Sequence, residues 1–225
     1  LLGCGVVANV VLPRTKGNGA DWLLISFGWG FAVFAGVYVG HASGAHLNPA
    51  VTLGMLAGQE PEYAPGVAIS VASTLVYIVA QMVGAFVGAV VCWLAYKKHF
   101  DAAGREGVPT IDVFSTGPEI RSHGWNFLTE VIATFVLVYV ILVFGETPSE
   151  LGPLAVGVLV VAIGMSLGGP TGYAINPARD LGPRIAHAVL PIPGKPGSNW
   201  SYSWVPVLGP VVGGVLAGVA AHLIG

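Results

Sequence analysis

The sequence contains two related octapeptides, GAHLNPAV at residues 44–51 and GYAINPAR at residues 172–179. Each follows a glycine-bearing apolar stretch, and each opens a further apolar piece, at about 49–58 and 177–190. Both pieces are shorter than the roughly 20 residues that a helix needs to cross a bilayer. Asn is a good helix cap and Pro suits the first helical position. The pattern therefore predicts two half-helices, each beginning at an Asn-Pro-Ala signature.

Apolar stretches recur along the whole chain. Of its 225 residues 54% are hydrophobic and 9% are charged, whereas soluble domains carry about 25% charged residues. We expect an all-α membrane protein, with 1–225 as a single channel domain and residues 97–123 as a long polar loop. The chain begins with Leu and a short apolar run, so we expect a truncated N-terminus. Six spans are expected, at about 1–12, 22–43, 66–96, 124–144, 152–169 and 203–224.

The two signatures, Asn48-Pro49-Ala50 and Asn176-Pro177-Ala178, begin 128 positions apart and are expected to enter the membrane from opposite faces. This predicts an inverted repeat, with halves at about 1–97 and 124–225 and the working site at the midplane. Two half-helices placed end to end match one bilayer thickness of about 30 Å. Irregular backbone at that depth is tolerated where it is buried in protein or lines a water-filled cavity. The seam between the half-helices is the expected pore.

The chemistry of this seam suits neutral solutes. A single Asn-Pro-Ala would be explained as an ordinary helix cap, but two copies in matched contexts favour a joint role. Each helix N-terminus carries a partial charge of roughly +0.5, and each Asn amide offers N–H donors. A permeating oxygen would accept hydrogen bonds there, cations would be repelled and a proton wire would be interrupted. We therefore expect a passive channel.

With these signatures the chain resembles the major intrinsic protein (aquaporin) family over essentially all of its length, and within it the aquaglyceroporins of the bacterial glycerol-facilitator type. The resemblance implies a selectivity filter that contains Arg179, directly after the second signature, with Gly164 and Tyr173 before it. Gly164 leaves room beside the Tyr173 ring, and Arg179 offers five donors to adjacent hydroxyls. An amphipathic polyol fits this asymmetry, whereas a water-selective pore would be expected to carry a bulky polar residue such as His at position 164.

The aromatic residue that the second span should supply to the filter is less clearly placed. Trp29 is the best candidate, but it lies one residue closer to Asn48 than the family spacing. Either the span is shortened around 39–42, or the filter position falls on Gly28.

Further roles follow from the resemblance. It implies pore-lining backbone carbonyls at Gly44, Ala45, His46, Gly172, Tyr173 and Ala174. Glu130, an acid inside a span, should face the interior and, by resemblance, anchor a half-helix loop. His46 is expected to brace its loop rather than touch solute. Asp180 and Arg184 lie four apart, so they can pair, and by resemblance this usage is typical of glycerol facilitators.

Several classes of protein do not fit. There is no metal-ligand cluster, phosphate loop or nucleophile with a base, so we expect neither an enzyme nor a cofactor or metal site. Cys4 and Cys92 are expected to be small packing residues. The sequence has no stripe of basic residues, so we do not expect it to bind nucleic acid. A secondary transporter also uses inverted repeats, but usually carries more intramembrane ionisable groups. A water-selective channel is the nearer alternative.

The resemblance implies glycerol and water as permeants, a multi-pass position in the cell membrane and a homotetramer with one pore per subunit. The loops raise one conflict. By the positive-inside rule their basic residues would be cytoplasmic, whereas the family topology puts them outside, and we follow the family. The acidic loop at 145–151 would then be cytoplasmic. The basic loop residues are Arg14, Lys16, Lys97, Lys98, Arg105, Arg121 and Lys195.

Overall fold

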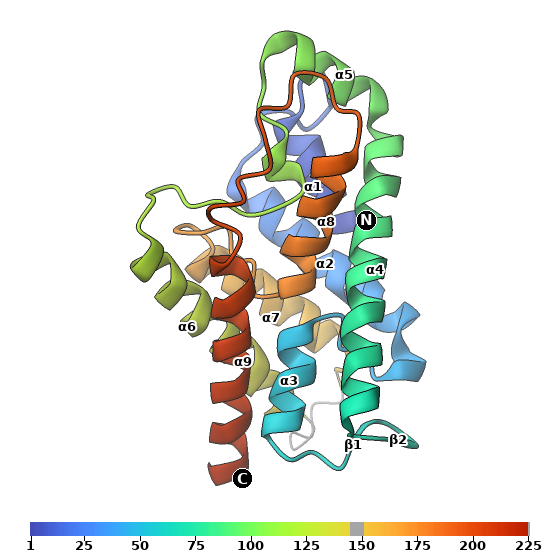
Figure 1. Cartoon of the computed structure of the whole chain (residues 1–225), viewed down its shortest axis with the longest axis vertical. Helices are drawn as coiled ribbons and strands as arrows, with labels where there is room; N and C mark the ends of the chain where they lie inside the picture. Colours follow the sequence, from blue (N-terminus) through green and yellow to red (C-terminus); the bar gives the residue numbers. More distant parts are fainter. Residues whose placement is uncertain (145–150, 225) are drawn as a thin grey trace.

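The computed structural model describes residues 1–144 and 151–224, which form a helical bundle with one small hairpin (Figure 1). The acidic loop residues Glu146 and Glu150 lie outside the described residues. The helices are α1 (Leu2–Val11), α2 (Trp22–Val39), α3 (Pro49–Ala57), α4 (Val71–Ala95), α5 (Lys97–Glu106), α6 (His123–Val143), α7 (Pro153–Leu167), α8 (Pro177–Val189) and α9 (Val205–Ile224), with short 3-10 turns η1 (His41–Ser43) and η2 (Ile111–Val113) and strands β1 (Glu62–Ala64) and β2 (Val67–Ala68).

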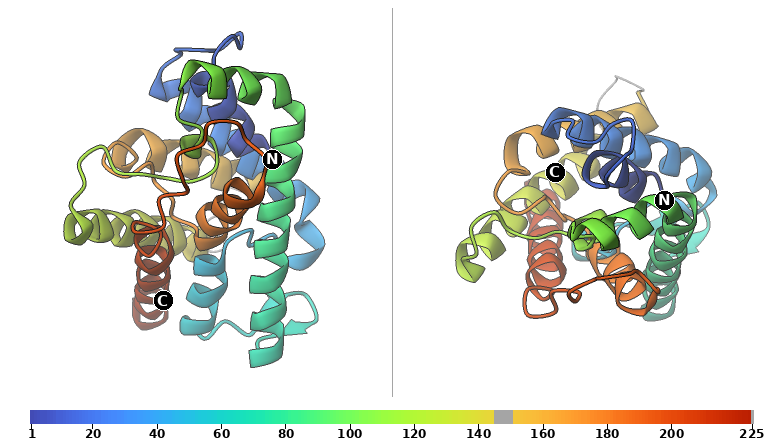
Figure 2. Two further views of the ribbon diagram at one scale, coloured as in Figure 1. Left: turned by 45° about the horizontal axis from the view of Figure 1, so that its top comes forward. Right: turned by 90° about the horizontal axis from the view of Figure 1, so that it is seen from above.

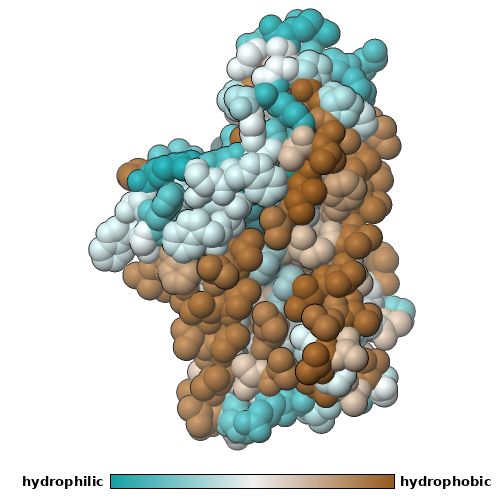
Figure 3. Space-filling view, in the orientation of Figure 1, coloured by the Kyte–Doolittle hydropathy of each residue, from teal (hydrophilic) through white to brown (hydrophobic). Residues whose placement is uncertain are grey.

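The six spans expected from the sequence correspond to α1, α2, α4, α6, α7 and α9. Four of them, α2, α4, α6 and α9, are long and apolar enough to cross a membrane, while α1 and α7 are shorter apolar helices. Figure 3 shows a continuous apolar band on this face, between polar ends. Large apolar side chains of α4 and α9 are exposed, among them Val79, Val83 and Leu208. This band is the surface that a bilayer would cover.

Local capping sets where the spans begin and end. The Asp21 carboxylate accepts hydrogen bonds from the N–H groups of Leu23 and Leu24, as a helix start near Asp21 predicts. The expected start of the third span at residue 66 is wrong. Ser70 and Ser73 form a capping box that starts α4 at Val71, and the residues before it pair as the β1–β2 hairpin.

The prediction of a loop over 97–123 is also wrong in part, because its first ten residues form α5. Lys97 pairs with Asp101 one turn on, and Phe100 is fully buried against the bundle. Gly107, with φ of 71°, ends the helix. An i,i+4 ion pair and a buried aromatic side chain outweigh the loop-forming tendency of Gly104.

The two half-helices lie inside the bundle, with their N-termini facing each other (Figure 1). Helix α3 packs against α9, and α8 lies between α4 and α9 (Figure 2). Glycine makes the first contact possible: a Cβ on Gly218 would lie 2.1 Å from the carbonyl oxygen of Gly54. The second contact is similar, since a Cβ on Gly182 would lie 2.8 Å from the Ala85 Cβ. Small residues thus allow both half-helices to pack closely against their neighbouring helices.

Cys4 and Cys92 lie in one apolar cluster between α1, α4, α5 and α8. Both thiols are free and buried, and their neighbours in the cluster include Phe100 and Phe114. Their role as packing residues agrees with these surroundings. Within residues 1–144 and 151–224, no group of three or more His, Cys, Asp or Glu side chains is placed to hold a metal ion.

Candidate functional site: a pore at the half-helix junction

The two Asn-Pro-Ala signatures are joined by a reciprocal pair of hydrogen bonds. Asn48 Nδ2 donates to the carbonyl oxygen of Ile175 at 2.7 Å, and Asn176 Nδ2 donates to that of Leu47 at 2.8 Å. The Oδ1 atom of each Asn accepts from its own helix, at Ala50 N for α3 and at Ala178 N for α8. Each amide therefore caps one half-helix and ties it to the loop of the other.

The two loops before the signatures share one backbone conformation. In the first, Gly44, Ala45 and Leu47 have φ of 73°, 50° and 54°. In the second, the matching positions Gly172, Tyr173 and Ile175 have φ of 81°, 38° and 43°. Left-handed conformations of this kind cost roughly 1–3 kcal/mol at non-glycine residues and persist only where the surroundings hold them. The internal repeat seen in the sequence is thus a repeat of backbone shape.

The second loop is held by a buried carboxylate. Glu130 of α6 is 1% exposed and accepts three hydrogen bonds from the loop. Its Oε1 atom accepts from Thr171 Oγ1 at 2.6 Å and Ala174 N at 3.0 Å, and its Oε2 atom accepts from Ile175 N at 2.8 Å. Charge-assisted bonds to backbone N–H groups fix this loop.

The first loop is held by an imidazole instead. His46 is buried, with Nδ1 2.9 Å from Thr52 Oγ1 and Nε2 3.0 Å from the carbonyl oxygen of Tyr63. Gln81 of α4 donates to the same Thr52 hydroxyl at 3.0 Å. These contacts tie the loop to α3, to the hairpin and to α4. His46 thus links its loop to both neighbouring segments through its two ring nitrogens, and it also borders the cavity described below.

Arg179 lies directly over the ring of Trp29. Its Cζ atom is 4.0 Å from the ring centroid, a cation–π contact, and Nη1 donates to the carbonyl oxygen of Phe114 at 3.5 Å. Of the two residues considered for the filter position, Trp29 is the one that contacts Arg179. Gly28 faces α1, because a Cβ there would lie 2.4 Å from a Val6 methyl group. Helix α2 ends at Val39, and the η1 turn follows at His41–Ser43.

Gly164 and Tyr173 are in close contact. A Cβ on Gly164 would lie 2.8 Å from Tyr173 Cζ and 3.1 Å from Ser26 Oγ, so the Tyr173 ring itself uses the space that the glycine leaves. The indole N–H of Trp22 donates to the Gly164 carbonyl at 2.8 Å, and its ring meets Tyr173 edge to face with centroids 5.7 Å apart. Sequence reasoning missed Trp22 and Ser26. Their spacing with Trp29 along one face of α2 is a signal that could have found them.

A cavity of about 60 Å³ lies at the junction, and Tyr173 borders it whereas Gly164 does not. A single water needs roughly 10–15 Å³ of such volume, so a few small molecules fit. The polar part of the lining comes from Arg179, Trp29, Asn48 and Asn176, together with the loop residues His46, Tyr173 and Ala174. The apolar part was not identified from the sequence and consists of Val33, Leu47, Val51, Leu137, Ile141, Val156, Val160 and Ile175. Gly44, Ala45 and Gly172 belong to the same loops but do not border this cavity.

Residues 1–221 match the sequence profile described as Major intrinsic protein. The chain belongs to the major intrinsic protein family. It is 53% identical over 215 residues to glycerol uptake facilitator protein 3 of Lactiplantibacillus plantarum, covering 94% of this chain and 85% of the relative. The probable glycerol uptake facilitator of Thermotoga maritima is 52% identical over 216 residues, covering 94% and 88%. The crystal structure of the aquaglyceroporin from Plasmodium falciparum superposes with a TM-score of 0.84 and 31% identity, covering 99% of this chain and 89% of that one.

In this member of the major intrinsic protein family, Asp180 and Arg184 form the ion pair that their spacing predicts. Asp180 Oδ1 accepts from Arg184 Nε at 2.8 Å, and both side chains are completely buried. Beyond them Lys195 closes the C-terminal end of α8. Its Nζ donates to the carbonyl oxygens of His187, Ala188 and Leu190 at 2.6–2.7 Å. Partial desolvation lowers the pKa of Lys195 from its usual value.

Proposed function

We propose that this protein is a passive channel that conducts glycerol and other small neutral polyols, together with water, and excludes ions and protons. The observation that carries the proposal is the pair of contacts beside the cavity, where the Arg179 guanidinium lies over Trp29 and the Tyr173 ring lies against Gly164. Aromatic rings offer an apolar wall to a carbon backbone, and the guanidinium replaces the hydration of adjacent hydroxyls. Two relatives more than 50% identical are named glycerol uptake facilitators, which supports the same solute.

The remaining sequence expectations become part of this proposal. The loop carbonyls line the pore and the two halves of one channel domain, about 1–97 and 124–225, form an inverted repeat. The protein sits in the cell membrane as a homotetramer and catalyses no reaction. Abundant glycine on the spans is compatible with close contacts between subunits.

Stopped-flow light scattering on proteoliposomes tests the choice of solute. Vesicles placed in a glycerol gradient should shrink as water leaves and then reswell as glycerol enters. The double variant Gly164→His/Tyr173→His should still shrink quickly but should lose the rapid reswelling. Gly124→His is the matched control, because a Cβ added at Gly124 would face open space. Wild-type vesicles that shrink without reswelling would support the water-selective alternative.

A transporter is distinguished in the same vesicles. Channel flux should rise in proportion to the glycerol gradient and should not change when sodium or proton gradients are imposed or collapsed. Saturation at low glycerol, or dependence on an ion gradient, contradicts a channel.

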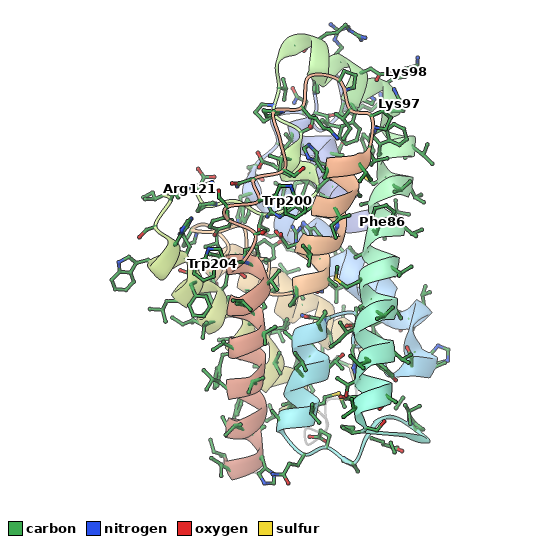
Figure 4. The ribbon with its side chains drawn as sticks, viewed as in Figure 1. Phe86, Lys97, Lys98, Arg121, Trp200 and Trp204 are labelled. Carbon is green, nitrogen blue, oxygen red and sulfur yellow. The ribbon has the colours of Figure 1, made fainter. Side chains whose placement is uncertain are left out.

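We also propose the family orientation, with α5 on the outside. Figure 4 shows Lys97 and Lys98 at this end of the molecule. The variant Lys98→Cys, in a Cys4→Ser/Cys92→Ser background, should react with a membrane-impermeant maleimide applied to intact cells. Labelling only after the cells are opened would reverse the orientation and agree with the positive-inside rule.

A further inference from the structure

The segment from Thr110 to Thr116 reaches into the bundle above the second signature. The segment belongs to the polar loop that the sequence predicts over 97–123, yet Thr110, Phe114, Ser115 and Thr116 are all at least nine-tenths buried. The segment also contacts the second signature loop, since a Cβ on Gly172 would lie 3.3 Å from the Cβ of Thr116. It therefore packs against the loop that leads into the second signature.

Every polar group of Thr116 is held by the buried ion pair of α8. Its N–H and its hydroxyl both donate to Asp180 Oδ2, at 2.7 and 2.8 Å. Its carbonyl oxygen accepts from Arg184 Nη2 at 3.0 Å. Buried charges need such additional partners, because their mutual attraction alone does not offset their desolvation. Asp180, Arg184 and Thr116 thus form one rigid unit, which we term the Thr116 clamp.

The clamp adjoins in sequence a second residue that contacts Arg179. Phe114 lies two residues before Thr116, and its carbonyl oxygen is the acceptor of Arg179 Nη1. Its ring is packed between Phe100 and His187, with centroid distances of 5.5 and 5.2 Å. The Arg179 guanidinium is therefore fixed by an aromatic face from α2 and by a backbone carbonyl whose own position depends on the clamp.

We propose that Thr116, acting with Asp180 and Arg184, is a positioning residue for Arg179 and thereby sets the solute selectivity of the channel. This inference rests on the proposed function, since it treats Arg179 as the group that contacts the permeant. Loss of the clamp lets the Phe114 carbonyl move, and the guanidinium then samples positions that change the width and polarity of the cavity.

Thr116→Val is the variant that tests the clamp most gently. It removes the hydroxyl donor but keeps the side-chain shape and the N–H bond to Asp180, whereas changing Asp180 or Arg184 leaves an unpaired buried charge and endangers folding. Thr116→Ser keeps the hydroxyl and serves as the rescue. Thr129→Val is the matched control, because the Thr129 hydroxyl donates only along its own helix, to the carbonyl oxygen of Trp125 at 3.0 Å.

The readout is the ratio of glycerol to water permeability in proteoliposomes, which does not depend on how many folded channels each vesicle holds. Thr116→Val should change this ratio at least about threefold. This change corresponds to a fraction of the free energy of a charge-assisted hydrogen bond, because the N–H bond from Thr116 to Asp180 remains. Thr116→Ser and Thr129→Val should keep the wild-type ratio. In an Arg179→Val background, Thr116→Val should have no further effect on the ratio, since its action passes through Arg179.

Two results would overturn the inference: an unchanged ratio in Thr116→Val, or an equal change when Arg179 is already absent. A crystal structure of Thr116→Val supplies a readout that needs no permeant. There the Arg179 guanidinium should leave its position 4.0 Å above the Trp29 ring or lose order. If wild-type vesicles pass water but no glycerol, the proposed solute is wrong. The crystal structure of Thr116→Val then tests the clamp alone, and an undisturbed Arg179 in that structure refutes the positioning role of Thr116.

Discussion

The guanidinium carbon of Arg179 lies 4.0 Å from the centroid of the Trp29 ring. Arg179 belongs to the first turn of α8, where the helix dipole disfavours a positive charge. The electron-rich ring face offsets part of this cost. The contact therefore holds a cation against one wall of the cavity at the half-helix junction.

Replacing the ring tests this contact. In Trp29→Leu the guanidinium loses a partner worth about 0.5–2 kcal/mol and the wall loses its bulk, so larger polyols should enter more easily. The flux of a five-carbon polyol relative to glycerol should rise several-fold in proteoliposomes. The control is Trp125→Leu, because the Trp125 side chain is 72% exposed on the outside of α6. Equal ratios in both variants would remove Trp29 from the filter.

A single methyl group at position 164 should disturb the filter. In Gly164→Ala the new Cβ would lie 2.8 Å from Tyr173 Cζ, so the ring must shift. Because the ring borders the cavity, we expect the ratio of glycerol to water permeability to fall several-fold. Gly169→Ala is the control, since nothing lies within 4 Å of that site. A wild-type ratio in Gly164→Ala would show that Tyr173 does not limit glycerol.

Glu130→Gln should destabilise the second signature loop. The carboxylate accepts three hydrogen bonds, and an amide turns one of its two acceptor positions into a donor that faces backbone N–H groups. A buried unsatisfied group costs about 1–3 kcal/mol, and the thermal midpoint in detergent should fall by several degrees. Glu62→Gln should not lower it, because the Glu62 carboxylate binds only an exposed turn N–H, that of Gly66. Equal midpoints in the two variants would contradict an anchoring role for Glu130.

Two glycine-to-alanine changes should have opposite results. Gly218→Ala places a Cβ 2.1 Å from the Gly54 carbonyl, so α3 can no longer seat against α9 and folded, monodisperse protein should be lost. Gly84→Ala meets open space on α4 and should be neutral or stabilising, by up to about 1 kcal/mol. Size-exclusion profiles and thermal midpoints measure both. A well-folded Gly218→Ala would mean that α3 and α9 can move apart enough to accept the added methyl group, which contradicts the prediction.

The sequence by itself determined the elements that local chemistry controls. Two Asn-Pro-Ala caps, apolar runs of membrane length and the repeat of GAHLNPAV as GYAINPAR were sufficient to predict two half-helices inside a bundle. The reason is that caps and apolar runs act over a few residues. Where a local signal was weak it was misread, as in α5, whose glycine and polar residues suggested a loop.

Only the tertiary structure decided what surrounds Arg179. The choice of Trp29 over Gly28 depended on which way α2 turns, and the contact with Trp22 joins Gly164 to a residue 142 positions away. The Phe114 carbonyl, 65 positions from Arg179, leaves no mark in the sequence, because any residue carries a carbonyl group. Such contacts are set by packing between distant segments rather than by local preference.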